Sequence, residues 1–298
     1  MGDSCCFYRI GGHDLAITFK NKGNDEALLP SFSPFRLEER PQSDALLFMM
    51  TVVDDLEWRE ASDEIGQFDC GGTVHGVYQM NDGGYQYIIR DIHGQTCCRM
   101  RSNVDFSQCQ ASLLGQTWEQ HNYGLNNAMM MAYAFASAQK GTMLMHASVI
   151  RCAGKGYLMT APSGTGKSTH TRLWYDNIPG CDLMNDDNPV VRVIGDQAIV
   201  YGSPWSGKTP CYRNIQAPIG GIVRIQQRPE NSIRKLRPTE AFCNLLPAMS
   251  NMKWDKRVYN GICDSIGELI RIVGMHELGC LPNAEAAILC HDTIASPF

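Results

Sequence analysis

Hydrophobic residues in the first third of the chain come in short runs separated by turn residues, which is typical of β-strands. Asn81-Asp82-Gly83-Gly84 between two such runs is a strong hairpin signal. The expected strands cover 7–10, 15–19, 76–80, 85–90 and 96–100. This pattern predicts a β-rich N-terminal domain over residues 1–122.

The pattern changes after residue 122. Residues 125–139 are apolar on almost every side, which predicts a helix buried between the two halves of the chain. Strands are expected at 143–151, 156–160, 181–187, 190–194, 198–201, 219–225 and 275–280, and helices at 168–174, 238–249, 256–273 and 283–291. We therefore predict an α/β fold, with a catalytic domain over 123–298 that includes the interdomain helix.

The most informative segment is Ala161–Ser168, one residue short of the phosphate-binding pattern G-x-x-x-x-G-K-[ST]. Gly164 and Gly166 let the backbone curl so that successive N–H groups point at one polyphosphate. Lys167 is expected to reach the β- and γ-phosphates, and Ser168 to offer its hydroxyl to Mg²⁺. An expected strand precedes the segment and an expected helix follows, as this motif requires. The predicted nucleotide-binding residues are Ser163, Gly164, Thr165, Gly166, Lys167, Ser168 and Thr169.

A second segment, Gly202–Thr209, matches the pattern in full. Pro204 has no N–H to donate, and Pro210 stands where the helix of the motif should begin. Trp205 would crowd a loop that must wrap tightly around phosphate. We therefore assign the phosphate-binding role to the first segment.

Two adjacent carboxylates end one of the expected strands. Asp186 and Asp187 follow Ser168 by 18 and 19 residues, and a parallel arrangement of strands would bring them beside the loop. Phosphoryl transfer needs carboxylates to hold Mg²⁺ and a group that takes the proton of the attacking hydroxyl. The pair can serve both needs.

His146 lies 15 residues before Ala161. A His at this distance, the loop and then Asp-Asp resemble the HPr kinase/phosphorylase family, in the P-loop group that includes ATP-type phosphoenolpyruvate carboxykinase. The resemblance covers about residues 140–226 and implies an HPr kinase-like P-loop domain. It implies that His146 lies near the acceptor or the transferred phosphate. It also implies Asp187 as proton acceptor, Asp186 as a metal residue with Ser168, and Lys167 as catalytic.

The chain departs from that family at two places. Ala161 replaces the usual Gly, and Gln216–Gly221 stands where the family carries a metal-binding Glu, so neither the reverse reaction nor HPr as substrate is implied. The segment 201–214 resembles that of less characterised HPr-kinase-like proteins. We expect its Trp205 and Lys208 to shape the acceptor site.

Composition narrows the class of protein. The 298 residues carry a net charge of −5 and no dense basic patch, which argues against nucleic acid as a partner. No apolar run approaches a membrane span, and the start has no apolar leader. We expect a cytoplasmic protein whose 13 cysteines are reduced and mostly buried. A homo-oligomer is compatible with the sequence.

These features together predict a kinase that transfers the γ-phosphate of ATP, or of another nucleotide, with Mg²⁺ to a hydroxyl. The acceptor is a Ser or Thr of a peptide or protein, or a small-molecule alcohol. The alternatives are a nucleotide-binding regulatory or assembly module without transfer chemistry and, less favoured, a carboxykinase-type lyase. The lyase lacks support because the chain is much shorter than that family and no matching Lys/His/Asp metal set is found.

Overall fold

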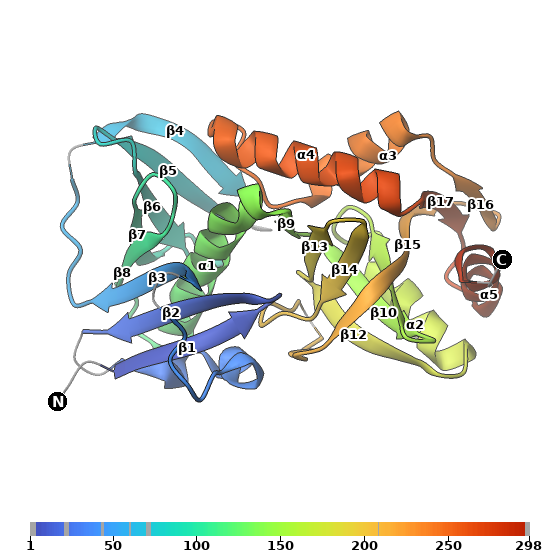
Figure 1. Ribbon diagram of the computed structural model, residues 1–298, viewed down its shortest axis with the longest axis horizontal. Coiled ribbons are helices and arrows are strands. Elements are labelled where there is room, and N and C mark those ends of the chain that lie inside the picture. The colour runs from blue at the N-terminus through green and yellow to red at the C-terminus, as the bar shows by residue number, and fades with distance from the viewer. Residues whose placement is uncertain are drawn as a thin grey trace. The chain divides into compact units, whose positions relative to one another are not determined.

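The computed structural model describes residues 4–20, 24–42, 45–59, 61–69, 73–207 and 209–295. The chain forms two compact units, each built on its own sheet (Figure 1). The first unit comprises Met1–Ser137 and Met252–Lys256, and the second comprises Ala138–Asn251 and Arg257–Phe298. The chain is a mixed α/β protein.

The first unit contains an eight-stranded sheet in the order β1-β2-β3-β8-β7-β6-β5-β4. Its strands are β1 Ser4–Ile10, β2 His13–Phe19, β3 Leu46–Val53, β4 Ala61–Asp69, β5 Val74–Met80, β6 Tyr85–Arg90, β7 Thr96–Ser102 and β8 Gln108–Leu113. The pairs β2/β3 and β3/β8 are parallel and the others are antiparallel. Short 3₁₀ turns, Glu26–Leu28 and Pro30–Phe35, occupy the proline-containing region between β2 and β3.

Helix α1 (Trp118–Ser137) packs on this sheet, against β3, β6, β7 and β8. Leu125, Met129 and Tyr133 are fully buried, at the i, i+4 spacing that keeps one helix face against a sheet. The helix expected to open the second domain is thus grouped with the first unit, because its apolar side chains belong to that core.

The second unit contains a nine-stranded sheet in the order β12-β10-β11-β15-β14-β13-β9, with β17 beside β15 and β16 beside β17. Its strands are β9 Thr142–Leu144, β10 Ala147–Cys152, β11 Lys155–Thr160, β12 Cys181–Asp187, β13 Val190–Ile194, β14 Gln197–Tyr201, β15 Gln216–Gln227, β16 Ser232–Lys235 and β17 Met275–Cys280. Its helices are α2 Lys167–Asn177, α3 Pro238–Leu245, α4 Lys256–Ile272 and α5 Ala284–Ile294. Helices α2 and α5 contribute Trp174 and Cys290 to one core cluster with Met159, Val223 and Leu278.

The strand expected over 143–151 is two strands. β9 pairs with β13, whereas β10 pairs with β11 and β12. The break falls at Met145 and His146, whose N–H groups donate to the carbonyls of Pro189 (3.2 Å) and Ala248 (2.7 Å). His146 therefore lies immediately before β10, an interior strand of the sheet. Sequence patterns also missed β3, β4, β8 and β16.

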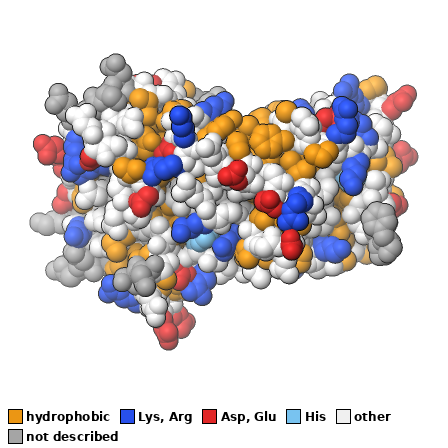
Figure 2. Space-filling model, turned by 45° about the horizontal axis from the view of Figure 1, so that its top comes forward, with side chains coloured by type: hydrophobic (Ala, Val, Ile, Leu, Met, Phe, Trp, Pro, Cys, Tyr) orange, Lys and Arg blue, Asp and Glu red, His pale blue; other side chains and the backbone are white. Residues whose placement is uncertain are grey.

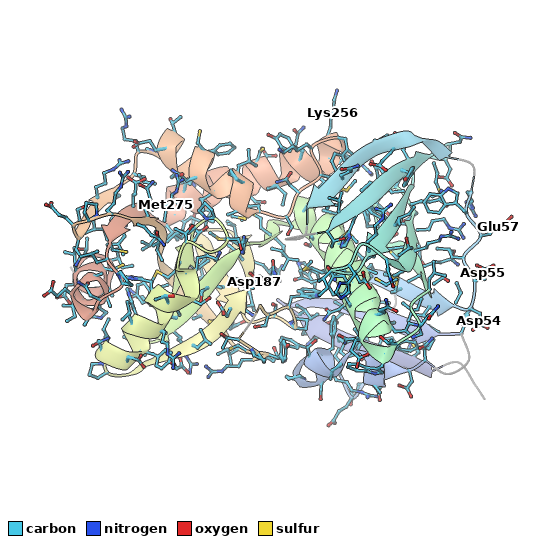
Figure 3. All side chains as sticks on the ribbon, turned by 180° about the vertical axis from the view of Figure 1, so that it is seen from behind. Asp54, Asp55, Glu57, Asp187, Lys256 and Met275 are labelled. Carbon is cyan, nitrogen blue, oxygen red and sulfur yellow. A yellow bond between two sulfur atoms is a disulfide. The ribbon has the colours of Figure 1, made fainter. Side chains whose placement is uncertain are left out.

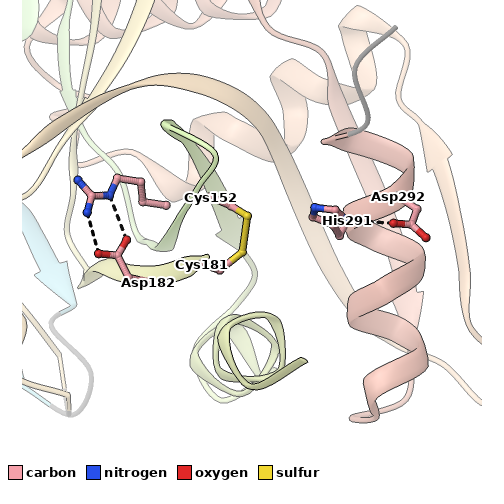
Figure 4. Close-up of a disulfide and its surroundings, with 6 residues drawn as sticks. Cys152, Cys181, Asp182, His291 and Asp292 are labelled. Carbon is pink, nitrogen blue, oxygen red and sulfur yellow. Dashed lines mark hydrogen bonds and ion pairs between the residues drawn. A yellow bond between two sulfur atoms is a disulfide. The ribbon is translucent and has the colours of Figure 1, made fainter. Parts of the chain in front are cut away.

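The cysteine prediction is wrong for one pair. Cys152 and Cys181 are direct partners across β10 and β12, with Cα atoms 4.3 Å apart, and form a disulfide (Figure 4). Beside it, Arg151 Nη2 donates to Asp182 Oδ2 at 2.8 Å, and Arg213 Nη1 lies 2.8 Å from the same oxygen. The expectation failed because strand register, which places the two thiols together, is not visible in local sequence.

The surface carries charges of both signs. On the face seen in Figure 2, Lys and Arg side chains are interspersed with Asp and Glu side chains. Asp54, Asp55 and Glu57, labelled in Figure 3, are exposed on the loop that follows β3. Among the described residues, no helix is both long enough and apolar enough to cross a membrane.

Two glycines of α4 give a test of the packing in the second unit. A Cβ at Gly261 would lie 2.6 Å from the carbonyl oxygen of Ala138, whereas a Cβ at Gly267 would meet nothing within 4 Å. Replacing Gly with Ala inside an open helix stabilises by about 1 kcal/mol. We expect Gly267→Ala to raise the urea midpoint and Gly261→Ala to lower it. Urea midpoints that shift in the same direction and by the same amount in both variants would contradict this packing.

Candidate functional site

The predicted phosphate-binding loop, residues 161–168, here called the phosphate loop, connects β11 to α2. Gly164 and Gly166 have φ of 77° and 115°, a backbone region that side chains disfavour. Gly166 caps α2 without a side-chain hydrogen bond, so the first N–H groups of the helix remain available to an anion. Ala161 is not among the described residues with positive φ, so the position usually held by Gly accommodates a methyl group.

Lys167 is folded back over this loop. Its side chain is buried, with 8% of the residue exposed, and Nζ donates to the carbonyl oxygen of Ala161 at 3.1 Å. Burial lowers the pKa of Lys167, and the nearby carboxylates of Asp187 and Asp186 oppose that shift. The ammonium therefore contacts the loop backbone and is attracted by the two acidic residues.

Ser168 and Asp186 are in direct contact. The Ser168 hydroxyl lies 2.9 and 3.1 Å from the two carboxylate oxygens of Asp186, which is 4% exposed. β12 runs in the same direction as β11 but is separated from it by β10, to which both are antiparallel. The predicted parallel arrangement thus has one strand inserted, and Asp186 still reaches the first turn of α2.

Asp187 ends β12 and is held at both oxygens. Oδ1 lies 3.1 Å from Nε2 of His146, and Oδ2 accepts a hydrogen bond from Nδ2 of Asn188 at 3.0 Å. The side chains of His146 and Asp187 are 40% and 36% exposed. Asp187, labelled in Figure 3, has φ of 117°, which costs a non-glycine residue conformational energy. Such strain is most common at functional positions.

Ser206 and Gly207, in the loop that follows β14, bind the backbone at the end of β12. Trp205 is 4% exposed, so its ring belongs to the packing beneath the loop. Lys208, the other residue expected at the acceptor site, lies outside the described residues. Residues 209–215 form no helix and lead into β15. This second match to the phosphate pattern therefore lacks the strand–loop–helix context.

Sequence reasoning missed several residues of the site. Asn188 contacts Asp187, Ser206 contacts Asp186 and Ser203 contacts Asn188. Only the polar run 185–188 signals any of them in the sequence. His170, on α2, is buried. Burial lowers its pKa to about 4, and its Nε2 accepts from Trp174 Nε1 at 3.2 Å.

The side chains of His146 and Asp187 at the candidate site are partly exposed. Two hollows of about 680 and 610 Å³ lie elsewhere in the second unit, and neither is lined by the phosphate loop or by the Asp-Asp segment. A phosphate-binding loop holds its ligand with its own N–H groups and needs no enclosing cavity. Among the described residues, no cluster of three or more His, Cys, Asp or Glu could hold a metal ion.

Comparisons with known proteins assign this chain to no family. No family model and no curated protein sequence matches the chain. Among solved structures, it is similar to the Hpr(Ser) kinase/phosphatase from Coxiella burnetii, with 13% identity over 51% of this chain and 93% of that chain. The TM-score is 0.30, and a likeness at this level carries no functional weight.

The backbone of Asp187 yields a prediction that does not depend on function. Asp187→Ala and Asp187→Gly both remove the carboxylate, but only Gly accepts φ of 117° without strain. We expect the Gly variant to be more stable than the Ala variant by about 1 kcal/mol in urea unfolding. Asp182 lies in the same strand and has no positive φ. At that position we expect the Ala variant to be more stable than the Gly variant. An Ala variant at 187 as stable as the Gly variant would count against the strained conformation.

Proposed function

We propose that this protein is a nucleotide- and Mg²⁺-dependent kinase that transfers the γ-phosphate of ATP to a hydroxyl acceptor. The acceptor is a Ser or Thr of a peptide or protein, or a small-molecule alcohol. The observation that carries the proposal is the meeting of three groups in the second unit. These are the phosphate loop, the Ser168–Asp186 contact and the Asp187–His146 contact.

The donor site is built from backbone groups. The residues proposed to bind the nucleotide phosphates are Ser163, Gly164, Thr165, Gly166, Lys167, Ser168 and Thr169. The N-terminus of α2 adds a positive dipole end to this site. Lys167, already held over the loop, would turn its ammonium from the Ala161 carbonyl to the β- and γ-phosphates.

A divalent cation fits beside the loop. Hydroxyl and carboxylate oxygens are ligands that Mg²⁺ accepts, and Ser168 and Asp186 present both within 3.1 Å of each other. Mg²⁺ in protein sites usually takes one or two carboxylates and completes its shell with water and substrate phosphate. Two protein ligands therefore suffice. When bound, the ion would neutralise charge on the phosphates.

Asp187 is the proposed proton acceptor for the attacking hydroxyl. In the proposed transfer, the acceptor oxygen attacks the γ-phosphorus, its proton passes to the Asp187 carboxylate, and the nucleoside diphosphate leaves. His146 and Asn188 each contact one oxygen of that carboxylate and so orient it. The partial exposure of His146 and Asp187 leaves room for an acceptor to approach.

The first test removes the phosphate-binding lysine. Lys167→Ala loses a charge-assisted contact of ~1.5–3 kcal/mol, which weakens Mg·ATP binding by roughly 10- to 150-fold. Transfer of labelled γ-phosphate to a panel of hydroxyl acceptors should disappear, while the unfolding midpoint stays near that of the wild type. The matched control, Lys155→Ala, removes an exposed lysine of β11 and should change neither measurement. Turnover by Lys167→Ala at the wild-type rate would rule out the proposed donor site.

The second test separates the two carboxylates. Asp187→Asn keeps the shape but accepts no proton, so turnover should fall by roughly 10²–10⁴-fold with little change in nucleotide affinity. Asp186→Asn should raise the Mg²⁺ concentration needed for half-maximal turnover. A Mg²⁺ titration of both variants decides the assignment. Rescue of Asp187→Asn alone by excess Mg²⁺ would show that the roles are exchanged, and ATP binding without any turnover in the wild type would favour a binding module.

A further inference from the structure

The described residues of the loop 202–214 (202–207 and 209–214), here named the clamp loop, bind the backbone on both sides of Asp187. The carbonyl oxygen of Asp186 accepts from the N–H of Gly207 at 2.7 Å and from Oγ of Ser206 at 2.9 Å. The carbonyl oxygen of Asn188 accepts from Oγ of Ser203 at 2.6 Å. The peptide group before Asp187 and the peptide group after Asn188 are therefore both tied to the same loop.

The two serines also shape the clamp loop itself. Ser203 is fully buried, and its Oγ accepts from the N–H of Trp205 and from Nδ2 of Asn185, both at 3.2 Å. Oγ of Ser206 accepts from the N–H of Cys211 at 3.2 Å and lies 2.6 Å from the carbonyl oxygen of Thr209. Each hydroxyl thus links the loop to itself and to the Asp-Asp segment.

Two glycines allow the clamp loop to lie close to Asp187 and to Arg213. A Cβ at Gly207 would lie 3.1 Å from Cβ and 3.3 Å from Cγ of Asp187. A Cβ at Gly202 would lie 1.9 Å from the carbonyl oxygen of Arg213, so the base of the loop has no room for a side chain. The segment that matches a phosphate-binding pattern is occupied by contacts with its own chain.

We propose that Ser203, Ser206 and Gly207 are positioning residues that hold Asp187 in its left-handed conformation, with its carboxylate between His146 and Asn188. The inference rests on the proposed function, in which Asp187 accepts the proton of the acceptor. A residue at φ of 117° relaxes unless its surroundings fix it. The three hydrogen bonds to the flanking carbonyls supply that restraint.

The clamp loop binds the backbone carbonyl of Asp186 and not its carboxylate, so we expect the restraint to act on the rate more than on the binding of Mg·ATP. The clamp loop bonds to the backbone of residues 186 and 188, and none of these bonds involves the phosphate loop. A displacement of about 1 Å of a catalytic group can lower a rate by about 10²-fold. Loss of one clamp bond should therefore lower kcat while the affinity for Mg·ATP stays within about 3-fold of the wild type.

The experiment compares clamp variants with matched controls. Ser206→Ala, Ser203→Ala and Gly207→Ala alter the clamp, whereas Ser206→Thr keeps the hydroxyl. The control Ser265→Ala removes a buried hydroxyl that donates to the carbonyl oxygen of Gly261 at 2.7 Å, within α4. The control for Gly207→Ala is Gly267→Ala, with open space at its Cβ.

Three quantities are measured for each variant. They are the kcat of phosphate release from Mg·ATP with water as acceptor, the Kd for Mg·ATP by calorimetry, and amide hydrogen exchange of the segment 183–189. We expect Ser206→Ala to lower kcat by roughly 10- to 100-fold, to leave Kd within about 3-fold, and to speed exchange in that segment. Ser206→Thr and both controls should behave as the wild type. In the Asp187→Asn background, Ser206→Ala should cause no further loss of kcat, because both act through one group.

The outcomes separate the two proposals. If the clamp variants keep wild-type kcat and exchange, the positioning role is wrong and the kinase proposal stands. A loss of Mg·ATP affinity equal to the loss of kcat would also overturn the role, since the loop would then support the donor site. If the wild type neither binds nor turns over Mg·ATP, the proposed function fails, and exchange in the segment 183–189 still decides whether the clamp restrains Asp187.

Discussion

The candidate site depends on one antiparallel register, the pairing of β10 with β12. It sets Ala147 opposite Asp187 and Ser148 opposite Asp186, so His146, just before β10, meets the end of β12. Successive side chains of a strand point to opposite faces, which sends Asp186 to α2 and Asp187 to His146. A slip of one residue would exchange the faces of the two carboxylates, so Asp186 would no longer meet Ser168 and Asp187 would no longer meet His146.

Covalent and ionic contacts fix the same register at the opposite ends of these strands. The disulfide Cys152–Cys181 joins direct cross-strand partners, and the neighbouring pair Arg151–Asp182 makes a two-point ion pair. Between these contacts and the site, the pairing shifts between Val149 and Ile150. The β10–β12 pair is thus held firmly at one end, while its other end carries the strained Asp187 and its clamp.

Local sequence predicted the parts of the site that local chemistry determines. The positive φ of Gly164 and Gly166, the helix beginning at Lys167 and the strand ending at Asp187 all follow from short-range patterns. Short-range patterns did not predict three other features. These are the insertion of β10 between β11 and β12, the contacts of Ser203 and Ser206, and the φ of Asp187. These arise from pairings between distant segments, and no spacing along the chain encodes them.

The central claim is that the loop 161–168, with Asp186, is the Mg²⁺–nucleotide site. A crystal structure of the protein with Mg²⁺ and a non-hydrolysable ATP analogue tests it most directly. The account predicts phosphates against the N–H groups of that loop, Lys167 on the terminal phosphates, Mg²⁺ between Ser168 and Asp186, and Asp187 facing the γ-phosphate. Phosphates bound by residues 202–209, or a nucleotide bound away from the loop 161–168, would contradict it.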